Sequence, residues 1–245
     1  MDNNDKKIST AVINRLPRYY RYLGDLLESD ITRISSKELS EKMNITASQI
    51  RQDLNNFGGF GQQGYGYNVE YLYNEIKKIL GLDKIYNLIV VGVGNIGQAL
   101  VNYTNFEKRG FVIKAVFDIN PRLVGMTIRG IEVYDVDYME EFVKNNDVDV
   151  AILAVPRSQS AKVANDLANW GVKGMWNFSH LDLQVPDDVV VENVHLTDSL
   201  MTLLYKINEV YSEDNDEISN NCLKDLDRED ETINITNNND NFDNE

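Results

Sequence analysis

One short stretch, residues 88–97 (LIVVGVGNIG), constrains the fold of this chain more than any other. Four apolar residues run into three glycines spaced G-x-G-x-x-G, which predicts a buried strand, a tight turn and a helix beginning near Asn95. In dinucleotide-binding folds the first glycine allows the turn, the second lets the backbone approach a pyrophosphate, and the third lets the helix pack on its strand. The N–H groups at the start of that helix also attract phosphate. Ordinary turns carry such glycines too, so the surrounding sequence is needed to distinguish a dinucleotide site from a plain glycine turn.

The residues that follow favour a nucleotide site. An amphipathic run over residues 99–106 predicts the helix, and a second strand over 111–117 ends in Asp118, 21 residues after Gly97. An acid at about this distance usually holds the hydroxyls of the adenosine ribose. No arginine follows Asp118 directly, which favours NAD(H), because a carboxylate repels the 2′-phosphate of NADP(H). Arg122 is close enough to keep the NADP(H) alternative open.

Strands and helices continue to alternate as far as residue 195. Apolar segments predict strands at 131–134, 148–155, 174–177 and 189–191, and helices are predicted over 139–144 and 161–170. This alternation is typical of the α/β class, with a Rossmann-type, doubly wound parallel sheet. Ligands of such sheets lie beyond the carboxyl ends of the strands. We therefore expect the residues at two strand ends to surround the nicotinamide half of a dinucleotide: Val155, Pro156, Asn177 and Phe178.

The first 80 residues predict a different domain. A helix is expected over residues 10–27, with an apolar stripe of Ala11, Ile13, Leu16, Tyr20, Leu23 and Leu27. Two capping-box patterns follow: Ser35 with Glu38 opens a helix through Met43, and Thr46 with Gln49 opens another through residue 55. Two short helices joined by a tight turn, after a longer helix, are typical of a helix-turn-helix. An ordinary helical hairpin with a polar face is the alternative.

The second short helix would be the recognition helix of that motif. Arg51 can fork onto guanine, and Gln52 can pair with adenine. The segment 57–67 (FGGFGQQGYGY) holds five glycines and four aromatic residues, so it predicts a wing whose tip lies along a minor groove. A helix over residues 69–80 would link this winged domain to the next. The predicted DNA-binding residues are Arg15, Arg18, Arg21, Thr46, Ser48, Gln49, Arg51, Gln52, Gln62 and Gln63.

Charge is spread unevenly along the 245 residues, whose formal net charge is −15. Residues 1–60 carry nine basic and eight acidic side chains, whereas residues 213–245 carry two basic and twelve acidic ones. The acidity of the whole chain therefore does not argue against DNA binding at its start. Cys222 is the single cysteine, so we expect no disulfide framework, no metal site and a reducing compartment, the cytoplasm. No apolar run of about 18 residues predicts a membrane span.

The end of the chain predicts a helix and a tail. Residues 196–211 are strongly helical, with Leu196, Leu200, Leu203, Leu204 and Ile207 on one face. This helix could pack on its own sheet or reach across to a partner subunit. The predicted domains are a winged-helix DNA-binding domain (1–80), a Rossmann NAD(H)-binding domain (82–195), a dimerisation helix (196–211) and a disordered acidic tail (212–245).

In this order the predicted domains resemble the Rex family of redox-sensing transcriptional repressors, over roughly residues 8–211. The resemblance rests on LPRYYR (16–21), SQIRQDL (48–54), FGQQGYGY (60–67), GVGNIG (92–97) and VPR (155–157). It implies a homodimer, with the C-terminal helix exchanged between subunits. It also implies that this dimer binds double-stranded operator DNA when NADH is scarce and releases it when NADH binds. Because one chain carries both a helix-turn-helix and a dinucleotide fingerprint, we further expect NAD+ to oppose the release.

The resemblance also implies roles for single residues. Arg51 would read bases, and Tyr103 with Arg21 would belong to the switch between nicotinamide and DNA. Gln52 stands where the family usually carries lysine, and His195 where an acid is expected; the nearest acid is Asp198. The residues expected to contact NADH or NAD+, from motif, strand ends and resemblance together, are Gly92, Val93, Gly94, Asn95, Ile96, Gly97, Tyr103, Asp118, Val155, Pro156, Asn177 and Phe178.

The alternative function is an NAD-dependent oxidoreductase with an accessory N-terminal domain. No catalytic residue is expected, because no second substrate domain follows the nucleotide domain and the chain holds only two histidines, His180 and His195. His180 follows a strand end and could face a ligand, but a surface or hydrogen-bonded structural histidine is the favoured interpretation. A constitutive DNA-binding protein with a relic nucleotide fold is a third hypothesis.

Overall fold

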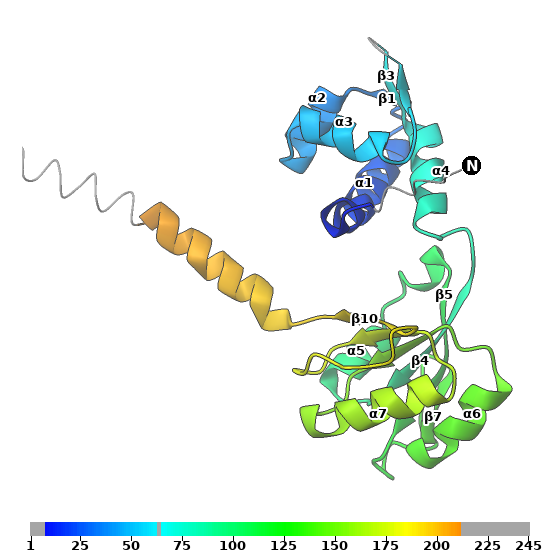
Figure 1. Cartoon of the computed structure of the whole chain (residues 1–245). Helices are drawn as coiled ribbons and strands as arrows, with labels where there is room; N and C mark the ends of the chain where they lie inside the picture. Colours follow the sequence, from blue (N-terminus) through cyan, green and yellow to red (C-terminus); the bar gives the residue numbers. More distant parts are fainter. Residues whose placement is uncertain (1–7, 63–64, 212–245) are drawn as a thin grey trace, which may run out of the picture.

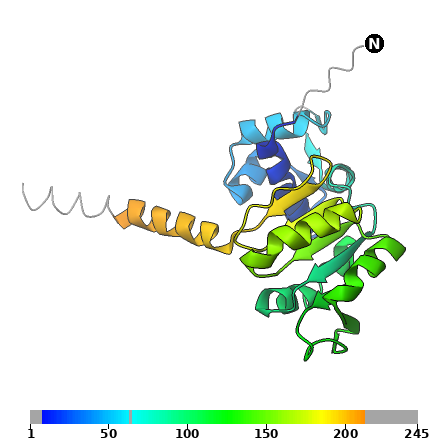
Figure 2. The same cartoon turned by 60° about the horizontal axis from the view of Figure 1, so that its bottom comes forward.

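The computed structural model describes residues 8–62 and 65–211. Helices and a small sheet form one end of the body, a larger sheet flanked by helices forms the other, and the chain passes between them after α4 (Val69–Ile79) (Figure 1). The two ends have separate hydrophobic cores. A long C-terminal helix projects away from both in two views (Figures 1 and 2).

The N-terminal end is a winged helix-turn-helix, as predicted. Its three strands are antiparallel, in the order β1-β3-β2, and the β2–β3 hairpin forms the wing. The bounds are α1 (Thr10–Glu28), β1 (Arg33–Ile34), α2 (Ser36–Met43), α3 (Ala47–Asn55), β2 (Gly61–Gln62) and β3 (Gly66–Asn68). The two-residue strand β1 was missed, because so short a segment has no readable alternation of apolar and polar residues.

The apolar stripe of α1 differs from the predicted one. Leu16 and Leu23 are buried, but Ile13 is exposed, and Tyr20 and Leu27 are only partly buried. The buried positions, which recur at steps of three and four residues, are Val12, Leu16, Tyr19, Leu23 and Leu26. Apolar residues stand on both sides of this helix, so several stripes fit the sequence equally well. Packing against α4 selects among them, through contacts such as the stacked rings of Tyr20 and Tyr73.

One capping box is confirmed and the other is half formed. Ser35 Oγ accepts a hydrogen bond from the Glu38 N–H (3.1 Å), and the Glu38 carboxylate accepts one from the Ser35 N–H (2.8 Å). Thr46 Oγ1 accepts from the Gln49 N–H (3.2 Å), but the Gln49 amide does not return to Thr46. It donates instead to Asp53, one helical turn on.

The C-terminal end is a seven-stranded sheet in the order β10-β9-β8-β4-β5-β7-β6, parallel except for β6. Numbered along the chain, the six parallel strands follow the Rossmann order 3-2-1-4-5-6. This confirms the predicted fold class. The bounds are β4 (Tyr86–Val91), α5 (Asn95–Val101), β5 (Phe111–Asp118), β6 (Thr127–Ile128), β7 (Ile131–Asp135), α6 (Met139–Asn145), β8 (Val150–Leu153), α7 (Arg157–Asn169), β9 (Gly174–Asn177) and β10 (Val190–Asn193).

Successive residues of β4 face opposite layers of this sheet. Leu88 and Val90 belong to the core shared with Val101 of α5. Ile89 and Val91 belong to the core that includes residues of α6 and α7. A strand buried on both faces needs an unbroken apolar run, which is why LIVV could be recognised in the sequence.

Some bounds differ from the predicted ones. The helix predicted to begin near Asn95 does so, but it ends at Val101 and not at Phe106, and a 3₁₀ turn, Glu107–Arg109, follows before β5. The helix predicted from residue 161 begins four residues earlier, at Arg157, with Pro156 at its N-cap. The strand predicted over 148–155 spans only 150–153.

The C-terminal helix covers residues 196–211 of the described chain, as predicted. Every residue of it is exposed. The tail predicted to be disordered, with Cys222, lies outside the described residues, as does Gln63. In the described part of the chain, no helix has the length and hydropathy needed to cross a membrane.

Candidate nucleotide cavity and DNA-reading face

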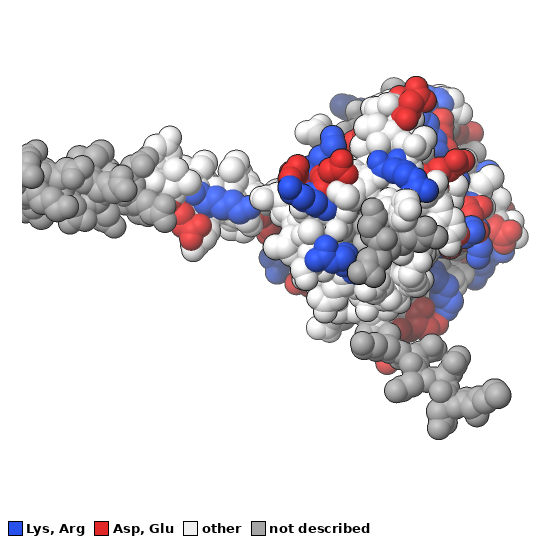
Figure 3. Space-filling view, turned by 90° about the horizontal axis from the view of Figure 1, so that it is seen from above, with Lys and Arg blue, Asp and Glu red and all other residues white. Residues whose placement is uncertain are grey.

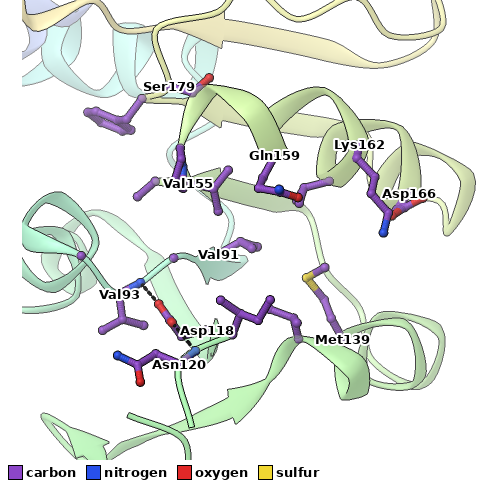
Figure 4. Close-up of a pocket in the computed structure, with 18 of the residues that line it drawn as sticks. Val91, Val93, Asp118, Asn120, Met139, Val155, Gln159, Lys162, Asp166 and Ser179 are labelled. Atoms are coloured by element: carbon purple, nitrogen blue, oxygen red, sulfur yellow. Dashed lines mark hydrogen bonds between the residues drawn. The ribbon is translucent and has the colours of Figure 1, made fainter. Parts of the chain in front are cut away.

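A cavity of about 950 Å³ opens at the carboxyl ends of the central strands (Figure 4). It lies between Val91, the last residue of β4, and Ala154, which follows β8. These two strands are where the strand order reverses, and ligands of doubly wound sheets bind at this crevice. The wall on one side comes from α7, and on the other from the loop after β5 and from the segment after β7, which includes the start of α6.

The three glycines of the motif have three different surroundings. Gly92 has φ of +94°, and a Cβ there would lie 2.6 Å from the Ala154 carbonyl oxygen. A Cβ on Gly97 would lie 1.9 Å from the Gly92 carbonyl oxygen. A Cβ on Gly94 would meet nothing within 4 Å, and Gly94 lines the cavity. The first and third glycines are therefore needed by the fold, whereas the second leaves open space where a pyrophosphate could approach.

Asp118 fixes the glycine turn. One carboxylate oxygen accepts from the Val93 N–H (2.6 Å) and the other accepts from the Asn120 N–H (2.8 Å), as the dashed lines in Figure 4 show. Asp118 is half-buried and lines the cavity. Each carboxylate oxygen can accept more than one hydrogen bond, so ribose hydroxyls can still bind. The sequence predicted the ribose role but not the clamp on the turn.

The acidic side of the cavity extends beyond Asp118. Asp137 and Glu140, which follow β7, line the same space. Across it, Arg157 and Lys162 project from α7. Sequence reasoning missed both acids, because only the return of the chain after β7 brings them beside the end of β5. Arg122, which kept the NADP(H) alternative open, is exposed and does not line the cavity.

Eight of the twelve residues predicted to bind the cofactor line this cavity: Gly92, Val93, Gly94, Ile96, Asp118, Val155, Pro156 and Phe178. Asn95, Gly97, Tyr103 and Asn177 do not. Tyr103 lies after α5, where its half-exposed ring packs edge-on against Phe106, with the ring centroids 4.9 Å apart. Gly97 contributes through its packing against the turn.

Asn177 is fully buried and orders the loop after β9. Its amide donates to the Leu181 carbonyl oxygen (2.7 Å) and to Asn193 Oδ1 (2.8 Å), and its Oδ1 accepts from the Ser179 N–H and hydroxyl. Ser179 and His180, which this loop carries, line the cavity. His180 is an exposed residue, as the favoured interpretation expected, and it also lines the cavity. His195 instead pairs with Asp182 (3.0 Å).

The outward face of α3 carries four exposed polar residues: Ser48, Arg51, Gln52 and Asn55. The Arg51 guanidinium donates to the Ser36 hydroxyl (2.9 Å), which holds the side chain beside the start of α2 and leaves other N–H groups free. Asn55 was missed by sequence reasoning. It lies one turn beyond Arg51, and a helical projection from Ser48 would have found it.

Two residues predicted to contact DNA, Arg15 of α1 and Gln49 of α3, bond to the buried side of α3. Arg15 forks onto the buried Asp53 carboxylate, and Gln49 donates to the same group. This geometry turns both side chains toward Asp53, whereas Gln49 was expected to reach base edges and Arg15 to contact DNA. Arg18 donates to the Met43 carbonyl oxygen (2.8 Å), and Arg21 is exposed.

In the view of Figure 3, the described residues at the wing end do not form a uniformly basic surface. Seen from above, Lys and Arg side chains alternate there with Asp and Glu (Figure 3). Arg33 lies beside the wing and donates to the Tyr65 carbonyl oxygen (3.2 Å). Among the described residues, no group of His, Cys, Asp or Glu is placed to hold a metal ion.

Two family models match the sequence. Residues 83–181 match the model described as a CoA binding domain, and residues 7–55 match the model of a putative DNA-binding protein N-terminus. The redox-sensing transcriptional repressor Rex of Caldanaerobacter subterraneus subsp. tengcongensis is 64% identical over 202 residues, 82% of this chain and 90% of the relative. Rex of Clostridioides difficile is 62% identical over 205 residues, 84% of this chain and 98% of the relative.

Solved structures of RSP, a Rex-family repressor, are also similar. RSP in complex with β-NAD+ and operator DNA is 61% identical, with a TM-score of 0.79, over 83% of this chain and 94% of RSP. RSP in complex with β-NADH is 58% identical, with a TM-score of 0.79, over 84% of this chain and 97% of RSP.

Proposed function

The chain belongs to the Rex family of redox-sensing transcriptional repressors, and we propose that it releases operator DNA when NADH enters the cavity of its Rossmann sheet. One observation carries the proposal: a winged helix-turn-helix and a glycine-lined cavity occur in a single chain. RSP, with the same fold, was crystallised with β-NAD+ and operator DNA and with β-NADH. We take residues 1–80 as the DNA-reading unit and 82–195 as the sensing unit.

The described residues fit a dinucleotide. Gly94 leaves space for a pyrophosphate, and Asp118 retains acceptor capacity for the hydroxyls of the adenosine ribose. Asp118, Asp137 and Glu140 give this half of the cavity a negative charge that disfavours a 2′-phosphate. Val155, Pro156, Phe178 and His180 then line the half that faces the nicotinamide. NADH supplies a redox signal here, and no chemical step on it is needed.

The DNA-reading unit places α3 in a major groove. Ser48, Arg51, Gln52 and Asn55 face outward and can reach base edges. Arg51 forks onto guanine, while the wing follows an adjacent minor groove. Arg18 and Arg21 on α1 contribute to the attraction for phosphates.

A homodimer completes the repressor. On the C-terminal helix Leu196, Leu200, Leu203 and Leu204 are between 51 and 56% exposed. So much apolar surface on a projecting helix is typical of a subunit interface. We propose that this helix crosses to the partner subunit, and that the two-fold dimer reads a palindromic operator. Such a dimer acts where operator DNA lies, in the cytoplasm, and needs no metal.

The two sites are coupled through their affinities. A ligand shifts a conformational equilibrium only by its differential affinity for the two states. If NADH weakens operator binding by a given factor, the operator weakens NADH binding by the same factor. Tyr103 and Arg21 remain our candidates for the residues that transmit this coupling.

A gel-shift experiment tests the proposal. Operator DNA is first selected from a random-sequence library with the free protein, and NADH or NAD+ is then titrated into the complex. We expect NADH to release the DNA and NAD+ to oppose that release. Equal NADH affinity with and without operator would contradict the coupling.

The alternative function, an NAD-dependent oxidoreductase, is tested by following NADH absorbance in the presence of small carbonyl compounds. We expect no NADH to be consumed.

A further inference from the structure

The strongest unassigned feature is a buried carboxylate in the DNA-reading unit. Asp53 of α3 is fully buried, and its two oxygens accept four hydrogen bonds. Arg15 donates through Nε (2.6 Å) and Nη2 (2.7 Å), the Tyr19 hydroxyl donates at 2.8 Å, and the Gln49 amide donates at 2.7 Å. Two of the donors come from α1, 34 and 38 residues away in the sequence.

The charge of Asp53 is well compensated. Burial alone raises the pKa of Asp53, but the hydrogen bonds from Arg15, Gln49 and Tyr19, together with the Arg15 charge, leave that pKa below its ordinary value. The Tyr19 hydroxyl stays a donor, because burial and the bond to Asp53 raise its pKa. Replacing a buried ion pair by apolar residues is often neutral or stabilising, so stability alone does not explain this group.

Directionality distinguishes this network from the packing around it. Ile50 and Leu54 are buried on the same side of α3 as Asp53. Their apolar contacts have no direction, so they tolerate small rotations of the helix. A forked arginine–carboxylate pair fixes both distance and orientation. A rotation of α3 about its own axis would break the fork. It would also move Arg51 and Gln52, on the opposite face, away from their base edges.

We propose that Asp53 is a positioning residue for operator recognition, locking the rotation of α3 against α1. Arg15 and Gln49 act through this carboxylate and do not read bases. The inference rests on the proposed DNA-reading function. It assigns sequence discrimination in part to a residue that touches no DNA.

An apolar variant of the network separates position from stability. The triple substitution Arg15→Met, Tyr19→Phe, Asp53→Leu removes the ion pair and the Tyr19 hydroxyl together, so no buried charge is left unpaired. The Gln49 amide loses its acceptor, but it is only partly buried. We expect Tm within about 5 °C of the parent and unchanged affinity for NADH, which binds in the other unit. An operator sequence is first selected from a random library with the parent protein. For each protein, the affinity for this operator is then divided by its affinity for scrambled DNA, which gives a discrimination ratio. We expect this ratio to fall at least about tenfold.

The ratio is insensitive to a merely structural defect. An unfolded fraction lowers both apparent affinities in one preparation equally and cancels from their quotient. The slope of affinity against salt should also stay unchanged, because the phosphate contacts remain. Should the triple variant fail to fold, Asp53→Asn and Arg15→Lys provide the same test. Asn cannot accept both arms of the fork, whereas Lys keeps the charge and one hydrogen bond, so discrimination should fall further in Asp53→Asn.

Gln49→Ala and Arg51→Ala form the matched comparison on α3 itself. The ratio of operator affinity to scrambled-DNA affinity should fall about tenfold or more in Arg51→Ala. It should fall less than about threefold in Gln49→Ala. An unchanged ratio in the folded triple variant, or in Asp53→Asn if the triple variant does not fold, overturns the inference. So does a loss in Gln49→Ala equal to that in Arg51→Ala. A parent that does not discriminate operator from scrambled DNA contradicts the proposed function instead.

Discussion

The carboxylate of Asp118 lies 2.6 Å from the backbone nitrogen of Val93 and accepts its N–H. The acid at the end of β5 is thereby tied to the turn between the first two motif glycines. The two parts of the nucleotide fingerprint, 25 residues apart in the sequence, form one rigid unit. A substitution at Asp118 therefore affects both the ribose acceptor and the shape of the turn.

Asp118→Ala should weaken NADH binding by about 1.5–3 kcal/mol, the usual worth of hydrogen bonds to a charged group. Operator binding by the free protein should persist, because the DNA-reading unit is intact. In a cell this variant would repress even when NADH is abundant. The measurement is release of operator during an NADH titration, with Arg122→Ala, outside the cavity, as control. Release at the parental NADH concentration would show that Asp118 is not the ribose ligand.

Arg51→Ala should have the opposite profile. Loss of a bidentate base contact costs about 1–3 kcal/mol in discrimination, whereas NADH affinity should not change. Competition binding with operators altered at single base pairs measures the first quantity, and fluorescence titration measures the second. Lys173→Ala, which breaks an exposed pair with Asp188 in the sensing unit, serves as control. Retained specificity at every base pair would remove Arg51 from the reading face.

The acidic side of the cavity predicts a preference for NADH over NADPH. Asp118, Asp137 and Glu140 all line the space where a 2′-phosphate would add charge of the same sign. Each like-charge contact near a protein surface costs on the order of 1 kcal/mol or more. Calorimetry should show weak or undetectable NADPH binding to the parent. Glu140→Gln should reduce the difference between the affinities for NADH and NADPH without greatly changing NADH affinity. Equal affinities of the parent for NADH and NADPH would contradict the placement of the ribose.

Truncation tests the C-terminal helix. A chain ending at Ser212 should form the proposed dimer and bind operator, because it keeps the whole helix over residues 196–211. A chain ending at Asn193 should be monomeric or aggregate. Light scattering coupled to size-exclusion chromatography distinguishes these states. A stable, soluble dimer from the shorter chain would assign the interface elsewhere.

Acid should act on the DNA-reading unit through Asp53. Its pKa is lowered in the folded protein, so its stabilising contribution is fully present above the unfolded value of about 3.9 and is lost as pH falls through the folded pKa. Asp53→Asn should abolish that part of the acid dependence. Urea titrations followed by circular dichroism between about pH 2.5 and 7 test this. An unchanged pH profile in the variant would mean that other carboxylates dominate.

Local sequence patterns predicted most helices and strands. The features that they missed depend on contacts between residues far apart in the sequence. The run LIVV before the glycines is visible because β4 is buried on both faces, and Ser35 and Glu38 form their box within one turn. Asp53 lies between two polar residues and a leucine, and nothing nearby in the sequence indicates that its charge is buried. Its partner, Arg15, is 38 residues away, on a helix whose buried side was itself misjudged.

The residues that line the cavity were also predicted only in part, because some of them come together through distant contacts. Asp118 was found from its distance to the motif, but Asp137 and Glu140 enter through the sheet order, which places β7 beside β5. Asn177 was predicted at a strand end and is there, yet its amide bonds inward to Leu181 and Asn193. The end of a strand gives the neighbourhood of a residue, and packing then decides which side chains face a ligand.

The different surroundings of Gly94 and Gly97 carry a genetic consequence. Each Gly-to-Ala change is a single nucleotide away in the codon table. At Gly97 the added methyl meets the carbonyl of Gly92, so the chain should fail to fold and the allele should behave as a null. At Gly94 the methyl meets no atom of the described residues within 4 Å, and it would fill the space that we propose for the pyrophosphate. That allele should fold, bind its operator and ignore NADH, a super-repressor one mutational step from the parent and three codons from a knockout.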